Sequence, residues 1–161
     1  MSISELDAKL LGAQRENRFR AILTLPSGVS GDSDTLRVLC QSTTVPGKTR
    51  GAITLQRLGK TARIAGDELS DETFTFNVLV PKDAQAIYKT FEGWFKLGNG
   101  NTGYKSKAKF EFLGLDNATT MAWQADGIWV STLPPVNFNA ESQDTISQFE
   151  VTLTLDDINP V

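Results

Sequence analysis

The side chains of this sequence that could carry acid–base chemistry are its carboxylates, because the chain has 19 Asp and Glu residues and no His. Carboxylates gather in two places, at residues 67–72 and at Asp156 and Asp157. Acid–base catalysis needs two carboxyls whose environments hold their pKa values apart. Neither cluster lies in an apolar run that would raise one pKa, so both are predicted to be solvated turns or strand ends. The sequence therefore predicts no catalytic residues and no enzyme.

Metal and cofactor sites are not predicted either. A single Cys and no His exclude a structural zinc site, and residues 67–72 lack the spacing of an EF-hand loop. Residues 98–103 match the glycine pattern of dinucleotide binding, but that motif joins a strand to a helix. Here a predicted helix precedes the glycines and a strand at 108–113 follows, which indicates a flexible loop. Cys40 is predicted to be a small buried hydrophobic residue.

Three lysines, Lys105, Lys107 and Lys109, alternate along one predicted strand beside Tyr104 and Phe110. Such a stripe could bind nucleic acid through phosphate contacts and stacking, or it could contact a partner protein. The formal net charge of −3 favours the partner protein, since chains that grip nucleic acid are usually basic.

Charge is unevenly distributed along the chain. Residues 110–161 contain Asp and Glu but no Lys or Arg, whereas residues 45–66 contain basic residues and no acid. The basic residues of that stretch are Lys48, Arg50, Arg57, Lys60 and Arg63. Separation of this kind suits a protein that meets copies of itself in a fixed orientation, although solvated faces remain the alternative.

The elements that must position these residues are mostly strands. Apolar and polar residues alternate at 18–25, 36–41, 73–80 and 148–155, which predicts half-buried antiparallel strands. One helix is predicted from Ala84 to the Gly98 stop, with an apolar stripe of Ile87, Phe91, Trp94 and Phe95. The fold class is mainly β, an antiparallel sandwich or barrel with one packed helix. Residues 1–17 are predicted to form a short helix or arm, and residues 18–161 a single domain.

Several segments, in order, resemble the tail tube proteins of contractile-tailed bacteriophages, a fold family shared with secretion-system and contractile bacteriocin tubes. The resemblance covers roughly residues 18–158 and is carried by the segments 36–47, 64–67, 73–76, 91–94, 129–136 and 146–157. The first of these reads Leu-Arg-Val-Leu-Cys followed by Pro46 and Gly47, and the fourth reads Phe-Glu-Gly-Trp.

The resemblance implies a structural subunit whose hexameric rings stack into a hollow tube inside a contractile sheath. Double-stranded DNA and the tape-measure protein would occupy the bore without specific binding. Further implied partners are the sheath, the baseplate or tail tip and the tail terminator. The implied location is the virion, after assembly in the host cytoplasm and without a membrane anchor.

Two hypotheses about parts follow. The hairpin at residues 46–66, bounded by Gly47 and Gly66, is expected to contact the adjacent ring through its five basic residues. Acids of the C-terminal third, with Asp144 and Glu150 as the best candidates, are expected to line the bore, where negative charge would let DNA slide.

Two other functions stay open from the sequence. A secretion-system or bacteriocin tube would have the same fold without carrying DNA. A monomeric ligand-binding β-barrel would need a large apolar cavity.

Overall fold

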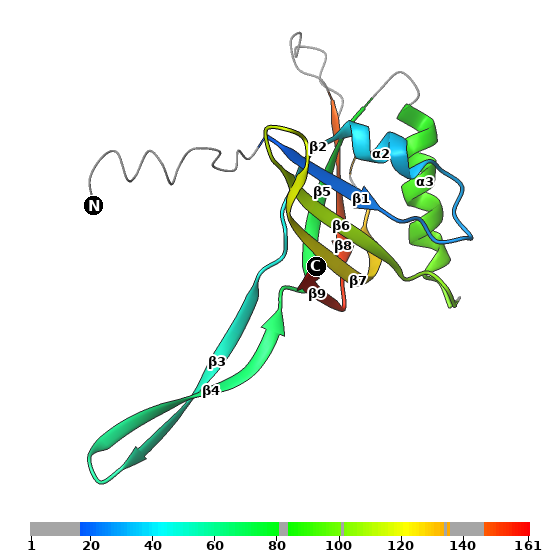
Figure 1. Ribbon diagram of the computed structural model, residues 1–161. Helices are drawn as coiled ribbons and strands as arrows, with labels where there is room; N and C mark the ends of the chain where they lie inside the picture. The colour runs from blue at the N-terminus through cyan, green and yellow to red at the C-terminus, as the bar shows by residue number, and fades with distance from the viewer. Residues whose placement is uncertain (1–16, 81–83, 101, 134, 136–146) are drawn as a thin grey trace, which may run out of the picture.

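The structure is a computed structural model that describes residues 17–80, 84–100, 102–133, 135 and 147–161 (Figure 1). The predicted N-terminal helix or arm lies outside the described residues, except for Asn17. The described elements, in chain order, are β1 (Phe19–Leu23), α2 (Ser33–Leu39), β2 (Cys40–Thr43), β3 (Lys48–Arg57), β4 (Lys60–Ser70), β5 (Thr73–Leu79), α3 (Ala84–Leu97), β6 (Ser106–Leu113), β7 (Thr119–Thr132), β8 (Gln148–Thr154) and β9 (Asp157–Pro160).

Seven strands form one antiparallel sheet in the order β1-β6-β7-β8-β5-β2, with β9 paired to β7. The long strand β7 pairs with β6 through its first part and with β8 through its last residues. Gly127, with φ of +68°, lies at a register shift of the β6 pairing, two residues before the pairing with β8 begins. The sheet folds into two halves, and the rings of Phe74 and Phe110 meet edge to face across them at 5.3 Å.

The sheet is not a closed barrel. Strands β1 and β2 stand at the two ends of the strand order and do not pair with each other. The sandwich prediction is therefore confirmed, and the barrel alternative is wrong for the single chain. Because β1 and β2 do not pair, a gap separates their outer edges, and each edge keeps unpaired backbone groups.

The predicted alternation is confirmed in β5 and β8. Phe74, Phe76 and Val78 of β5 are buried, as are the β8 residues Phe149, Val151 and Leu153, while the residues between them are not. Their register places Phe76 opposite Val151. The two strands thus present one apolar face to the core and one polar face outward.

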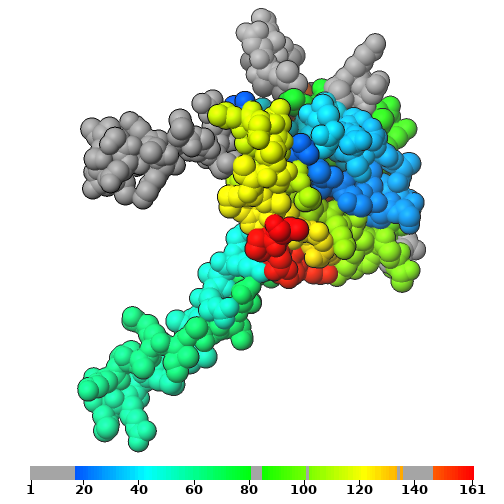
Figure 2. All heavy atoms as spheres, in the orientation of Figure 1, coloured from blue at the N-terminus to red at the C-terminus, as the bar shows by residue number. Residues whose placement is uncertain are grey.

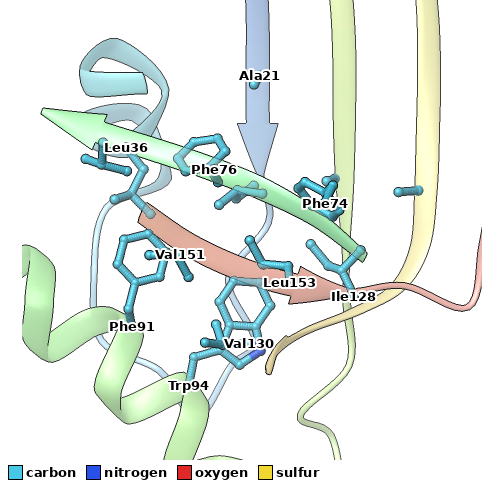
Figure 3. Packing of buried hydrophobic residues seen from close by; sticks show 14 of the residues in the cluster. Ala21, Leu36, Phe74, Phe76, Phe91, Trp94, Ile128, Val130, Val151 and Leu153 are labelled. Atoms are coloured by element: carbon cyan, nitrogen blue, oxygen red, sulfur yellow. The ribbon is translucent and has the colours of Figure 1, made fainter. Parts of the chain in front are cut away.

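Helix α3 packs against this core, as its apolar stripe predicts. Phe91 and Trp94 are almost fully buried and point toward Val130 and Val151 (Figure 3). The Trp94 Nε1–H donates a hydrogen bond to the Tyr104 carbonyl at 2.8 Å, so the indole is satisfied inside the core. Phe95, predicted to belong to the same stripe, is 40% exposed instead, because it lies at the edge of the buried face.

The strand predicted at residues 36–41 is wrong over most of its length. Residues Ser33–Leu39 form α2, and only Cys40 and the residues after it are extended. Asp32 caps the helix by accepting bonds from the Asp34 N–H at 3.1 Å and the Thr35 hydroxyl at 2.6 Å. Leu36 is buried in the core, whereas Val38 is 72% exposed. In a strand these two residues would lie on the same face and would both be buried.

Candidate functional site

The candidate site is a two-stranded hairpin, β3 and β4, that projects from the body (Figures 1 and 2). Every residue of β3 is exposed. The predicted hairpin is confirmed as an element, but its second strand runs to Ser70, beyond the predicted end at Gly66. Leu58 and Gly59 form the tip with φ of 51° and 72°, the signature of a type I′ turn.

One face of the hairpin is apolar and uncovered. Ile53 lies opposite Ile64, and Leu55 lies opposite Ala62. The side chains of Ile53, Leu55 and Ile64 are each more than half exposed. An isolated two-stranded hairpin is marginal in water, and a contiguous exposed apolar face marks an interaction surface. The alternation of Ile53 and Leu55 with Thr54 and Gln56 was a signal for this face that charge-based reasoning missed.

The basic residues of the hairpin divide into two groups. At its base, Lys48 Nζ lies 2.9 Å from Glu68 Oε1 and 3.5 Å from Asp157 Oδ1, and Arg50 Nη2 lies 3.0 Å from Glu68 Oε2. Lys48 also donates to Asn159 Oδ1 at 3.0 Å. The contacts of Lys48 with Asp157 and Asn159 attach the hairpin to β9, whereas Arg50 pairs with Glu68 inside the hairpin, so both cations already have partners.

The charges at the base perturb one another. The Lys48 hydrogen bond is the main reason that the pKa of Glu68 lies below its ordinary value. The pKa of Asp157 is lowered mainly by its hydrogen bond from Asn159, and Glu68 in turn raises the pKa of Lys48. All three directions favour the ionised forms, which keeps the base charged near neutral pH.

The other predicted basic residues, Arg57, Lys60 and Arg63, form a second group at the outer half of the hairpin. None of them makes an ion pair within the part of the chain that the structure describes. Arg57 and Lys60 lie directly opposite each other beside the turn. The tip therefore carries free positive charge next to the exposed side chain of Leu58.

The second predicted surface is only partly described. Asp144 lies outside the described residues. Glu150 is exposed on the polar face of β8, opposite Asn77 of β5. Its neighbours on that face are Thr73, Thr75, Gln148, Thr152 and Thr154. The result is a hydroxyl- and amide-rich sheet face with a single carboxylate.

The lysine stripe is locally neutralised. Lys105 lies 2.7 Å from Asp156, Lys107 lies 3.7 Å from Asp126, and Lys109 lies 2.8 Å from Glu111. Glu111 is buried and also faces Arg20 at 3.4 Å. These pairs leave little free charge for nucleic acid on β6, and they occupy several acids of the C-terminal third as well.

Several residues of the two carboxylate clusters considered for catalysis contact cations or backbone groups. Asp67 and Glu68 lie on β4, and Asp71 accepts the Gly47 N–H at 2.8 Å in the turn that follows. Asp156 and Asp157 face Lys105 and Lys48. Among the described residues there is no group of three or more potential metal ligands, and no helix there is long and apolar enough to span a membrane.

Comparison with known proteins identifies the fold. No family model and no curated protein sequence matches the chain. A chain of the sheath–tube complex of PVC, an extracellular contractile injection system, superposes with a TM-score of 0.71 at 17% identity, over 100% of this chain and 98% of that one. A chain of the anti-feeding prophage tube-terminating cap gives 0.70 at 18% identity, over 92% and 90%.

A more distant match is the crystal structure of an Hcp protein, with a TM-score of 0.50 at 10% identity, over 87% of this chain and 90% of that one. The fold implied by the tube-protein resemblance is thus confirmed. The chain has the fold found in these contractile injection assemblies.

Proposed function

We propose that this chain is a structural subunit of the hollow tube of a contractile tail or injection machine. The observation that carries the proposal is the free-standing hairpin with an uncovered apolar face and an unpaired basic tip. A surface of this kind needs a partner, and the fold is shared with a chain of a sheath–tube complex. A second copy of the same chain is the partner that an assembled tube would supply.

The proposed assembly is a hexameric ring, with successive rings stacked through the hairpins. The hairpin and the surface that receives it differ, so the interface is heterologous and can propagate into a ring or a filament. The free edges of β1 and β2 suit the same arrangement, because neighbouring subunits would cover them. The sheath, the tube terminator and the baseplate are the proposed further partners.

The polar face of β5 and β8 is the proposed bore lining. Hydroxyl and amide groups with one carboxylate, Glu150, provide no cationic sites for phosphate, so a duplex would pass without tight binding. In a phage tail the proposed content of the bore is double-stranded DNA with the tape-measure protein, and the proposed location is the virion.

A second candidate is the tube of a secretion system, a contractile bacteriocin or an extracellular injection system, which would not carry DNA. The structural matches from PVC and the anti-feeding prophage favour it. Both candidates assign the same role to the hairpin, and they differ only in the cargo. A monomeric ligand-binding barrel has less support, because the sheet stays open between β1 and β2.

Charge reversal at the hairpin tests the tube proposal. Arg57 and Arg63 changed together to Glu should leave the fold intact, since neither residue has an ion-pair partner in the described chain, and should weaken stacking. Far-ultraviolet circular dichroism checks the fold and sedimentation measures assembly. We expect the concentration needed for assembly to rise at least about tenfold, equivalent to about 1.4 kcal/mol per contact.

The matched pair of single changes is Arg63→Glu on the hairpin and, as the control, Lys89→Glu on α3, an exposed lysine that makes no ion pair among the described residues. This control should assemble like the wild type. Assembly of the hairpin variant at the wild-type concentration would contradict the assigned role of the hairpin.

A further inference from the structure

The turn that follows α3 contains an asparagine directly before a glycine, Asn99-Gly100. It begins the connection from α3 to β6 (Figure 1), and residues 98–100 are all exposed. The glycine pattern of residues 98–103 predicts a loop, and the proposed tube function assigns no role to Asn99.

The surroundings of Gly100 leave its backbone nitrogen accessible. Gly100 has a φ of +76°, and no atom lies within 4 Å of a Cβ added there. Its N–H donates to the Gly98 carbonyl at 2.9 Å. That bond closes a turn of only three residues at the surface, so water competes with it and the nitrogen is released without unfolding of α3.

The side chain of Asn99 is not held in place. Its backbone N–H donates to the Lys96 carbonyl at 3.0 Å and so anchors the turn to the end of α3. Within the part of the chain that the structure describes, the side-chain amide takes part in no hydrogen bond. The amide carbon is therefore free to turn toward the next backbone nitrogen.

Two other asparagines are held differently. Asn77 lies in β5, and its Nδ2 donates to Ser42 Oγ at 2.8 Å. Asn117 is exposed, but the nitrogen that follows it is engaged, because the Ala118 N–H donates to Asp116 Oδ1 at 3.1 Å. A methyl group on Ala118 also hinders attack, which a glycine does not.

Asn159 is protected twice. Its Oδ1 accepts from Lys48 at 3.0 Å and its Nδ2 donates to Asp157 Oδ2 at 2.7 Å. The next residue is Pro160, which has no backbone N–H. Asn99 thus differs from Asn77 and Asn159 in its unbonded side chain, and from all three in the glycine after it.

We infer that Asn99 is a site of spontaneous deamidation in the folded protein. The Gly100 nitrogen loses its proton to water or hydroxide and forms a bond to the Asn99 Cγ, which closes a five-membered imide. The bond from Cγ to Nδ2 breaks, and the amide nitrogen takes a proton from water and leaves as ammonia. Water then opens the imide at either carbonyl and gives aspartate or isoaspartate. Water is the co-reactant, and nothing is oxidised or reduced.

The product places a new charge at an unfavourable position. A carboxylate just after α3 lies beside the partial negative charge of the last helical carbonyls. Lys96, the basic residue of the last turn, already pairs with Glu92 at 2.7 Å. The modified chain should therefore be less stable than the original, and its formal net charge of −3 becomes more negative by one. The inference does not depend on the proposed tube function.

Peptide mapping by mass spectrometry tests the site. Native protein and protein unfolded in guanidinium chloride are incubated at mildly alkaline pH, and conversion is followed over time at Asn99, Asn77, Asn117 and Asn159. Native Asn99 should convert within a few-fold of its unfolded rate and give isoaspartate as well as aspartate. Folding should slow Asn77 and Asn117 strongly, and Asn159 should form no imide in either state because Pro160 follows it.

Substitutions test the assignment independently. Asn99→Gln keeps an amide but would need a six-membered ring, so isoelectric focusing should show the more acidic form appearing many-fold more slowly. Asn17→Gln, at another exposed asparagine, is the matched control and should accumulate that form at the wild-type rate. Asn99→Asp should have the acidic isoelectric point from the start and a lower thermal midpoint.

Two results would overturn the inference. One is native Asn99 that keeps its amide, or converts no faster than native Asn117, while the unfolded chain reacts at Asn99. The other is wild-type accumulation of the acidic form in Asn99→Gln. Neither result depends on whether the chain assembles, so each leaves the tube proposal to its own experiment.

Discussion

Gly127 shows how one residue sets the geometry of the sheet. It has a φ of +68°, and a Cβ at this position would overlap the carboxylate of Asp156. Gly127→Ala should therefore lower the free energy of unfolding, by about 1–3 kcal/mol for the backbone strain alone. Chemical denaturation provides the measurement.

Gly93 is the matched control for that substitution. It is exposed on α3, and nothing lies within 4 Å of an added Cβ. Gly93→Ala should raise stability by about 0.5–1 kcal/mol, because Gly is a poor helix former. Equal effects of the two substitutions would contradict the role assigned to Gly127.

Cys40 provides a prediction of pH dependence. Burial raises the pKa of its thiol from 9.0 to about 12, which agrees with the predicted hydrophobic role, although the residue is only half-buried. Between pH 9.0 and about 12, the Cys40 thiol keeps its proton in the folded state but loses it in the unfolded chain. The stabilising contribution of the neutral thiol is therefore complete below pH 9.0 and is lost as pH rises toward about 12.

Alkylation with iodoacetamide measures this difference. The native thiol should react slowly at pH 9.0, where the thiol of the unfolded chain is half ionised. Equal rates for native and urea-unfolded protein at that pH would contradict the predicted burial effect.

At the scale of elements, the base of the hairpin should respond to acid. The Glu68 and Asp157 carboxyls face Lys48, Arg50 and Asn159, and both have pKa values below the ordinary 4.5 and 3.8. Their ionic contacts are present above those ordinary values and are lost as pH falls through the lower values of the folded state. The hairpin should then lose its fixed angle to the body.

Spin labels at Gln56→Cys and Leu115→Cys, in a Cys40→Ala background, report that angle as a distance distribution. The distribution should be narrow at neutral pH and broaden well below pH 3.8. Asp157→Asn with Glu68→Gln should give the broad distribution already at neutral pH. An unchanged distribution in that variant would show that these contacts do not hold the hairpin.

The sequence predicted those elements whose pattern is local. The alternation in 73–80 and 148–155 and the stripe from Ile87 to Trp94 led to the observed strands and helix, because burial follows the period of each element. The strand predicted at residues 36–41 was wrong because Leu36 and Val38 can also belong to a short helix. The Asp32 cap favours the helix over the strand. A capping aspartate inside a loop-like segment was the signal that could have corrected it.

The site was predictable only in part, for a related reason. The five basic residues of 45–66 do lie on the hairpin, but the sequence could not show that Lys48 meets Asp157, more than a hundred positions away. Long-range pairing of this kind depends on the tertiary fold. The same holds for Lys105, whose partner Asp156 lies between β8 and β9, 51 positions along the chain.

At the scale of the whole molecule, the chain combines an open sandwich with a hairpin whose apolar face is exposed. Two free sheet edges and an exposed apolar hairpin face are each unfavourable for an isolated subunit in water. The proposed head-to-tail assembly would cover them with copies of one chain. This is why a tube subunit explains the molecule better than a monomeric binding protein.

Negative-stain electron microscopy of the purified chain across a concentration series tests this account most directly, with a tail-tip or baseplate template added in a parallel series. A tube subunit should form rings or hollow tubes of one diameter, whose number rises with concentration or with template. A chain that stays monomeric at every concentration, with and without the template, would contradict it.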